Sequence, residues 1–308
     1  MKKNTHYSIE KKQARWGFAF TVPCLLFFAV FSFYPIISAF ITSLTNRDAI
    51  RRTWSFIGLE NYKYLFTQSN GGFSLMNSLK ATGIFTIGTF IPMVIVSLIL
   101  AVLIMQLRRP GQSKLFELAF YTPAVLSSVV AATIWMILFQ PTGLFNQMAN
   151  TILHTAGKDY QWLTKDSMLR ASTIIVYFWK YIGYFTILFI TGLASIPPTL
   201  YEAAIVDGSS RWHTFWKITL PLLKPTIMLV SIMAMLQCLK TFSTQYMFVQ
   251  GGAAREPIDV ITMNIYYTGV VNRRLGRSSA MSIILFVIML FFTFLQFMAQ
   301  RGGDDVEY

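Results

Sequence analysis

Apolar residues in this chain gather into long runs without charged side chains, and short polar stretches separate the runs. A helix that crosses a bilayer needs about 20 mostly apolar residues. We predict six membrane-spanning helices, over about residues 16–45, 81–107, 119–139, 171–196, 225–248 and 279–299. No run alternates apolar and polar residues in the manner of an outer-membrane barrel. The predicted fold class is therefore an all-α, polytopic membrane protein.

The first apolar run extends from Trp16 to Asn46 without a charge. A secretory signal has a shorter apolar region of about 7–15 residues and a small-residue cleavage site. Because this run is longer and lacks such a site, we interpret it as a retained first span. The predicted organisation is a basic tail at 1–15, a membrane domain at 16–300 with a polar loop at 199–224, and a tail at 301–308.

Composition supports this interpretation. Only 13% of the 308 residues are charged, against about 25% in average soluble proteins, so a soluble enzyme is excluded. The net charge of +13 indicates basic flanks beside apolar spans rather than a nucleic-acid partner. The two cysteines, Cys24 and Cys238, both lie in apolar runs. They predict neither a disulfide scaffold nor a metal site.

The distribution of Lys and Arg predicts that both termini are cytoplasmic. The first tail carries five basic residues and the short loop 108–114 carries three, and basic residues close to the spans favour the inside. The opposite side is also basic, with Arg47, Arg51, Arg52, Arg273, Arg274 and Arg277. These arginines either bind lipid phosphates or a docking protein, or they favour an anionic substrate.

The loop at 199–224 predicts two short helices. Thr199 and Glu202 have the spacing of a capping box that starts a helix over about residues 200–207. Gly208 then supplies a left-handed turn. Ser209 or Ser210 can cap a second helix over about residues 211–220, which Pro221 ends. The loop is therefore expected to be a shaped protrusion.

This loop resembles the signature loop of permease subunits of binding-protein-dependent ABC importers. The matching segments are Glu202-Ala203-Ala204, Asp207-Gly208 and Ile218-Thr219-Leu220-Pro221. The carbohydrate-uptake branch, of the maltose "F" type, is similar at Phe56–Tyr62, Leu193–Pro197 and Ser279–Ser282. One detail departs from the family, since its usual Gly-Gly-Pro after span five is Gly251-Gly252-Ala253 here.

The resemblance implies that the loop couples the permease to a separate ATPase. The residues implied in coupling are Glu202, Ala203, Ala204, Asp207, Gly208 and Arg211. No G-x-x-x-x-G-K-[ST] motif is present, so ATP and magnesium are expected in the partner subunit, with no catalytic residue or cofactor in this chain. The other implied partners are a second permease forming a heterodimer, homo- or heterodimeric ATPase subunits, an extracytoplasmic solute-binding protein, a carbohydrate and the lipid of a bacterial inner membrane. No nucleic acid is expected.

A polar stripe on span five predicts the substrate pathway. Gln237, Thr241 and Thr244 recur at i, i+4 and i+7 and would share one helix face. Ionisable residues inside spans usually face a bundle interior or water, which adds Lys180 and Lys240, with Tyr184 one turn after Lys180. The competing interpretations are lysines that extend to the membrane interface and polar contacts that only join helices.

Other classes of protein fit the sequence less well. An ion-coupled secondary transporter would usually show inverted repeats and carboxylates inside its spans, and neither is found. A membrane enzyme would need a nucleophile, a metal cluster or an acid–base pair. The three histidines, His6, His154 and His213, are scattered without metal spacing. An importer of glycerol phosphate rather than sugar remains an alternative.

Overall fold

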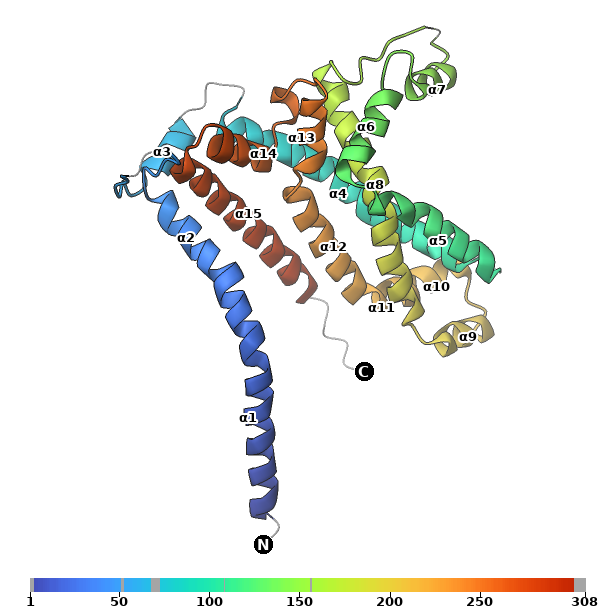
Figure 1. The fold of residues 1–308 in the computed structure, drawn as a ribbon. Helices are drawn as coiled ribbons and strands as arrows, with labels where there is room; N and C mark the ends of the chain where they lie inside the picture. Colours follow the sequence, from blue (N-terminus) through green and yellow to red (C-terminus); the bar gives the residue numbers. More distant parts are fainter. Residues whose placement is uncertain (1–2, 51–52, 68–72, 108, 156, 302–308) are drawn as a thin grey trace. The chain divides into compact units, whose positions relative to one another are not determined.

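The computed structural model describes residues 3–50, 53–67, 73–107, 109–155 and 157–301. In this part of the chain the regular secondary structure is helical, with one isolated β-bridge between Thr45 and Phe56 (Figure 1). The predicted all-α class is confirmed. Arg51, Arg52, Arg108 and the tail at 302–308 lie outside the described residues.

The chain divides into two compact units, residues 1–67 with 265–284 and residues 68–264 with 285–308. Five helical segments are long and apolar enough to cross a membrane: Arg15–Ser43, Leu75–Met105, Asp166–Ala194, Lys224–Gln250 and Leu275–Ala299. A bent pair, Gly111–Val125 with Ser128–Leu138, makes a sixth if it is counted as one span. This agrees with the expected polytopic membrane fold.

The first unit contains a long broken helix and a short helix packed beside its end. Its elements are α1 (Lys3–Phe28), the π-helical turn η1 (Ala29–Phe33), α2 (Tyr34–Ser43), α3 (Glu60–Thr67), the π-helical turn η4 (Tyr267–Val271) and the first part of α15 (Leu275–Arg301). The buried Asn61 amide donates to the carbonyls of Ser43 and Thr45, both at 2.8 Å. One side chain of α3 thus satisfies carbonyls that α2 leaves free at its end.

The second unit contains the remaining elements. They are α4 (Leu75–Met105), α5 (Pro110–Val125), α6 (Ser128–Leu138), α7 (Leu144–Ile152), α8 (Asp166–Ala194), α9 (Pro198–Val206), α10 (Arg211–Thr214), η2 (Phe215–Thr219), α11 (Leu220–Leu222), α12 (Lys224–Leu239), α13 (Ser243–Gln250), η3 (Glu256–Ile258) and α14 (Ile261–Tyr266), whose last residues belong to the first unit. Helix α8 is the most buried span and packs against α4, α5 and α12 (Figure 1). Its Gly183 meets the backbone of Phe120 on α5 so closely that a Cβ would overlap it.

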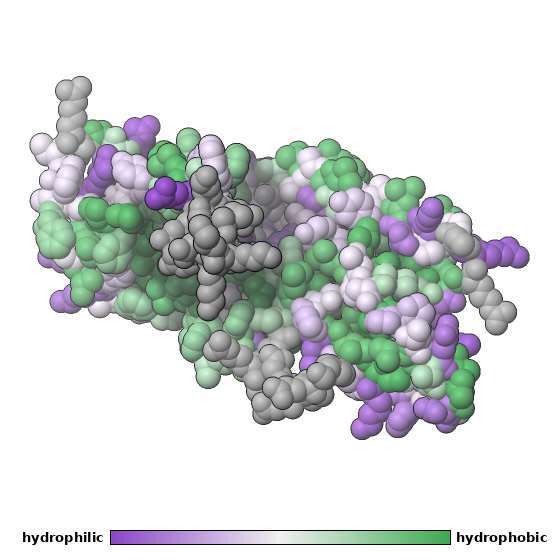
Figure 2. Space-filling model, turned by 90° about the horizontal axis from the view of Figure 1, so that it is seen from below, coloured by the Kyte–Doolittle hydropathy of each residue, from purple (hydrophilic) through white to green (hydrophobic). Residues whose placement is uncertain are grey.

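Helix α4 shows how a span separates its two faces. Ile87, Ile91, Ile95, Ile99 and Leu103 are about half exposed and recur every four residues, so they form one outward stripe. Exposed apolar side chains of this kind are typical of a surface that meets lipid or another apolar chain. Figure 2 shows hydrophobic residues over large parts of the surface of the molecule that it presents.

The predicted third span at 119–139 is not one continuous helix in the structure. Helix α5 ends at Val125, α6 begins at Ser128, and the two are bent by 100° at the break. Leu126 and Ser127 are extended, and the Ser127 hydroxyl accepts from the Val130 amide at 3.2 Å. A serine N-cap starts a new helix here, inside a run whose apolar composition gave no sign of it.

Candidate functional site

The loop predicted from the sequence contains a well-defined helix–turn–helix. Helix α9 ends in a glycine turn: the Gly208 amide donates to the Ile205 carbonyl at 3.0 Å, and the Ser209 amide to the Ala204 carbonyl at 2.9 Å. Gly208 has φ of +70°. This pair of hydrogen bonds with a left-handed glycine is the Schellman motif. Ser210 then caps α10 by accepting from the His213 amide at 3.2 Å.

Two details of the predicted loop are wrong. Helix α9 begins at Pro198 and its N-cap is Pro197, with no side-chain capping bond, so Thr199 and Glu202 do not form a capping box. Proline is suited to the first helical position because it lacks the amide that would be left unpaired. Pro221 also does not end the second helix: the turn before it widens into η2, and the chain stays helical through α11.

The exposed side of α9 has the character of a partner surface. Glu202, Ala203 and Asp207 are exposed, and Ile205 and Val206 are 74% and 85% exposed. Ala204 is buried inside the chain, so only Ala203 of the alanine pair is accessible. Apolar side chains this exposed on a short polar loop are typical of a surface that binds another protein or a membrane.

The loop is tied to span five through the second helix. The Tyr201 hydroxyl lies 3.2 Å from the Thr219 hydroxyl, which joins α9 to η2. From η2 the chain continues through α11 directly into α12. Arg211, at the start of α10, is exposed, and it helps line an apolar cavity of about 680 Å³ between the end of α4 and this loop.

Span five is broken at the point where the sequence predicted a continuous polar face. Helix α12 ends at Leu239 and α13 begins at Ser243, so Gln237, Thr241 and Thr244 do not lie on one unbroken helix. Hydrogen bonds from other elements hold the break. The Thr262 hydroxyl donates to the Thr241 carbonyl, and the Tyr177 hydroxyl to the Gln237 carbonyl at 3.0 Å. These donors satisfy carbonyls at the end of α12.

A cavity of about 440 Å³ lies beside this break, and it gathers most of the predicted pathway residues. Its lining comprises Ser128, Tyr177, Tyr181, Met233, Leu236, Gln237, Lys240, Thr241, Phe242, Ser243 and Thr244. Hydroxyls, an amide, an ammonium and aromatic rings therefore face one space within the bundle. The break itself brings Lys240 and Thr244 to the same cavity as Gln237.

Lys180 and Tyr184 are placed differently from this group. Lys180 is buried, and its ammonium donates to the Ser128 hydroxyl at 2.9 Å and lies 5.2 Å from the centre of the Tyr181 ring. It thus stands directly behind the cavity lining. Tyr184 is half-buried with its ring edge-on to Phe185, and it does not line the cavity.

The sequence interpretation missed Tyr181 and Ser128 as members of this site. The tyrosines Tyr177 and Tyr181 are one turn apart on α8, a spacing that could have been noticed. Ser128 could not have been found, because it reaches the cavity only through the unpredicted break between α5 and α6.

Two arginines of the basic cluster in the first unit make side-chain contacts within that unit. Arg274 lies 3.6 Å from the Asp48 carboxylate, and the Arg277 guanidinium is 3.5 Å from the centre of the Tyr64 ring. The backbone carbonyl of Arg273 accepts from the Ala49 amide at 2.9 Å. Two of these arginines therefore already have side-chain contacts that hold the ends of α2, α3 and α15.

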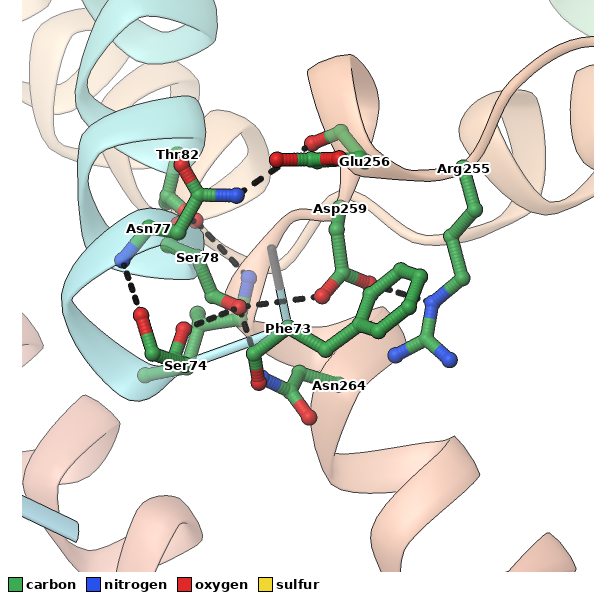
Figure 3. Close-up of polar contacts among 10 residues, drawn as sticks. Phe73, Ser74, Asn77, Ser78, Thr82, Arg255, Glu256, Asp259 and Asn264 are labelled. Carbon is green, nitrogen blue, oxygen red and sulfur yellow. Dashed lines mark hydrogen bonds and ion pairs between the residues drawn. The ribbon is translucent and has the colours of Figure 1, made fainter. Parts of the chain in front are cut away.

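A buried polar network joins the segment after span five to the start of α4 (Figure 3). Asp259 is fully buried, and it accepts from Arg255 at 2.8 Å and from Ser78 at 3.1 Å. Asn264 donates to Ser78 at 2.7 Å, and the Ile261 amide to Thr82 at 2.8 Å. Burial raises the pKa of the Asp259 carboxyl above its usual value, and the Arg255 guanidinium opposes this shift. The network fixes the return from α13 to α14.

The described residues do not bring three His, Cys, Asp or Glu side chains together as a metal site. The site instead offers hydrogen-bonding groups and one ammonium in a cavity beside span five, together with an exposed loop.

Comparison with known proteins places these features in a family. The family described as binding-protein-dependent transport system inner membrane component matches residues 79–302. The arabinooligosaccharides transport system permease AraP of Bacillus subtilis is 30% identical, covering 89% of this chain and 84% of that protein. The glycerol-3-phosphate permease UgpA of Rhizobium meliloti is also 30% identical, covering 89% and 91%.

The longest of these alignments runs along whole chains. The trehalose/maltose permease MalF of Thermococcus litoralis is 28% identical over 99% of this chain and 100% of that protein. A solved bacterial alginate ABC transporter, in complex with alginate pentasaccharide-bound periplasmic protein, has a chain with a TM-score of 0.80 and 25% identity, covering 96% of this chain and 97% of its own. The chain therefore belongs to the family of binding-protein-dependent transport system inner membrane components.

Proposed function

We propose that the chain is one permease subunit of an ATP-driven importer for a sugar or oligosaccharide. In this proposal it forms half of the translocation pathway, and a second permease forms the other half. The observation that carries the proposal is the exposed helix α9 with its glycine turn, in a chain of this family that also holds a polar cavity within the bundle.

The proposed coupling surface is the exposed face of α9. Ile205 and Val206 supply apolar contact, while Glu202, Asp207 and Arg211 supply charged contacts to a separate ATPase subunit. Gly208 and Ala203 keep the backbone accessible at the turn. ATP and magnesium belong to that partner, whose closure would move α9.

The proposed route of this movement runs through span five. The loop continues through η2 and α11 into α12, and the Tyr201–Thr219 contact keeps the two parts of the loop together. A tilt of α12 would change its angle to α13 at the break beside Lys240. Since that break borders the cavity, movement of the loop would alter access to the cavity.

The proposed substrate site is the cavity beside the break. Sugar hydroxyls need hydrogen-bond partners when they leave water, and Gln237, Thr241 and Thr244 offer them. Tyr177 and Tyr181 offer aromatic faces. A volume of about 440 Å³ is within the range of small-ligand sites. Tyr184 stays a predicted pathway residue without a place in this lining.

The proposed orientation puts α9 and both termini in the cytoplasm of a bacterium. The solute-binding protein would then dock on the opposite side of the membrane. Basic residues of the first tail and the region after α4 support this orientation.

Reconstitution in vesicles tests the proposal. Uptake of labelled oligosaccharide should require this chain, the second permease, the ATPase subunits, ATP and a loaded solute-binding protein together. Vesicles that lack any one of these components are the controls. Uptake driven by an ion gradient without ATPase subunits would instead identify a secondary transporter. ATP hydrolysis by the purified chain alone would also contradict the proposal.

A further inference from the structure

The cavity beside span five contains a basic residue that no acidic neighbour balances. Lys240 lines the cavity and is exposed within this chain, although it lies inside the candidate span Lys224–Gln250. Lys180 is buried one layer behind, bonded to the lining residue Ser128. Charged residues at membrane depth normally pair with one another or face a water-filled pathway.

Among the residues that the structure describes, no carboxylate is paired with Lys240 or Lys180. The cavity lining contains no Asp or Glu, and the ion pairs among the described residues join Arg255 to Asp259 and Arg274 to Asp48 rather than involving either lysine. Along the chain, the flanking acids are Asp207 and Glu256, outside the two ends of span five. The described part of the chain therefore leaves the charge of Lys240 available to an anion that enters the cavity.

Two helix ends lie at the cavity. One stabilises Lys240 when the cavity is empty, and the other favours an anion that enters it. Lys240 is the C-cap of α12, where the negative end of the helix dipole stabilises a cation when the cavity is empty. Ser128 is the first residue of α6, so the positive end of that helix lies at the cavity. An anion entering the cavity would meet Lys240 and this helix end, with Lys180 behind Ser128.

We infer that the transported substrate carries an oxyanion, either the carboxylate of a sugar acid or a phosphate, and that Lys240 binds it in the cavity. The inference rests on the proposed function, because it takes the cavity as the substrate path. Lys180 acts through Ser128 as a positioning residue. The hydroxyls and the Gln237 amide bind the neutral remainder of the substrate.

The arginines of the first unit are a weaker source of this selectivity. Arg274 is already paired with Asp48 and Arg277 is stacked on Tyr64. An ammonium with no acidic partner gains more from an incoming anion than a guanidinium that must give up an existing contact. Arg274 and Arg277 are therefore weaker candidates for the anion than Lys240 in the cavity.

Uptake of a matched pair of substrates tests the inference. The complete importer is reconstituted with its solute-binding protein and supplied with an oligouronide, with the same oligosaccharide after its carboxyl groups are reduced to alcohols, or with glycerol phosphate. The wild-type importer should take up one of the two anionic probes and discriminate against the neutral one. Which anionic probe is taken up distinguishes carboxylate from phosphate.

Substitutions at the cavity then locate the contact. Lys240→Gln should lower uptake of the anionic probe about tenfold, the loss of one charge-assisted contact, whereas Lys240→Arg should retain at least about half of it. Lys165→Gln, which removes an exposed lysine at the start of α8, is the control and should not change uptake. Ser128→Asp is a second, independent test in case Lys240→Gln does not assemble. It places a carboxylate at the cavity and should lower uptake of the anionic probe.

The outcomes separate the inference from the proposed function. Transport of the neutral oligosaccharide alone would overturn the inference and leave the importer function standing. Unchanged anionic uptake in both Lys240→Gln and Ser128→Asp would overturn the site assignment. Absence of uptake for every probe, with active ATPase subunits present, would instead count against the proposed function.

Discussion

Two interruptions of helical structure carry the proposed mechanism, and they are built in opposite ways. The turn at Gly208 is exposed, and its hydrogen bonds run between residues no more than five apart. The break between α12 and α13 contains neither glycine nor proline. It depends on the Thr262 hydroxyl, 21 residues away, and on the Tyr177 hydroxyl, 60 residues away.

This difference indicates a division of roles. A turn held by its own backbone keeps its shape when the rest of the protein moves, as a surface that transmits motion to a partner must. A break held by distant side chains changes when those elements shift. The turn at Gly208 is therefore suited to coupling to a partner, and the break in span five to changing shape in response. Variants at Gly208 and Thr262 test this difference, and variants at Gly183 and Asp259 test the packing and the buried network of the same unit.

The largest effect is expected where tertiary packing around the cavity is closest. Gly183→Ala puts a Cβ into the backbone of Phe120 and Tyr121 on α5, and backbone atoms cannot move aside as a flexible side chain can. We expect a loss of about 3 kcal/mol or more, measured as a lower midpoint of thermal unfolding in detergent. Gly83→Ala, on α4 with open space around it, is the control and should be neutral or slightly stabilising. Equal effects of the two would contradict the close α5–α8 contact.

The second effect concerns the coupling turn. Gly208→Ala forces a side chain into a left-handed conformation and should cost about 1–2 kcal/mol. Gly157→Ala is a matched control, because Gly157 has φ of +71° and also has open space around it. The two variants should lose similar stability, while only Gly208→Ala should lower ATP-driven uptake by about tenfold or more. Equal uptake in both would remove Gly208 from the coupling surface.

The third effect concerns the break in span five. Thr262→Val deletes the donor to the Thr241 carbonyl and should destabilise the protein by about 1 kcal/mol, with a change in uptake because the break borders the cavity. Thr191→Val is the control, since its hydroxyl is exposed and bonds only to its own helix. An unchanged unfolding midpoint for Thr262→Val would show that the break does not need this distant support.

The smallest effect is a pH dependence from the buried network. The pKa of Asp259 is raised in the folded state from its usual 3.8, so the folded protein keeps this proton to higher pH than the unfolded chain does. Its contribution to stability is full below pH 3.8 and is lost as the pH rises through the native pKa. Asp259→Asn should therefore flatten the fall in the free energy of unfolding over this window, measured as the unfolding midpoint at each pH. Glu256→Gln, an exposed acid nearby, should leave the fall unchanged.

The two interruptions also show what could be learned from the sequence. The glycine turn and the cap of α10 were predicted correctly at Gly208 and Ser210 because their signals are local. The capping box was wrong because Pro198 starts the helix two positions earlier than predicted. Long apolar runs were enough to predict the spans in outline, since length and composition decide membrane insertion.

The cavity could be predicted only in part. Gln237, Lys240, Thr241 and Thr244 were recognised as polar residues in an apolar span, and the structure brings them to one cavity. Their arrangement depends on breaks at 126–127 and 240–242 that apolar composition conceals. The partners of Asp259, such as Ser78, lie up to 181 residues away, beyond any local pattern.

The coupling claim is tested most directly by a photochemical cross-link from α9. Val206→Cys, in a chain whose exposed Cys24 is replaced by Ser, is labelled with a benzophenone maleimide and assembled into the complete importer. Ile152→Cys on α7, also largely exposed, is the control. If α9 is the coupling surface, illumination should join Val206→Cys, but not Ile152→Cys, to the ATPase subunit, and ATP should change the yield. A cross-link to the ATPase subunit from Ile152→Cys alone would contradict this assignment.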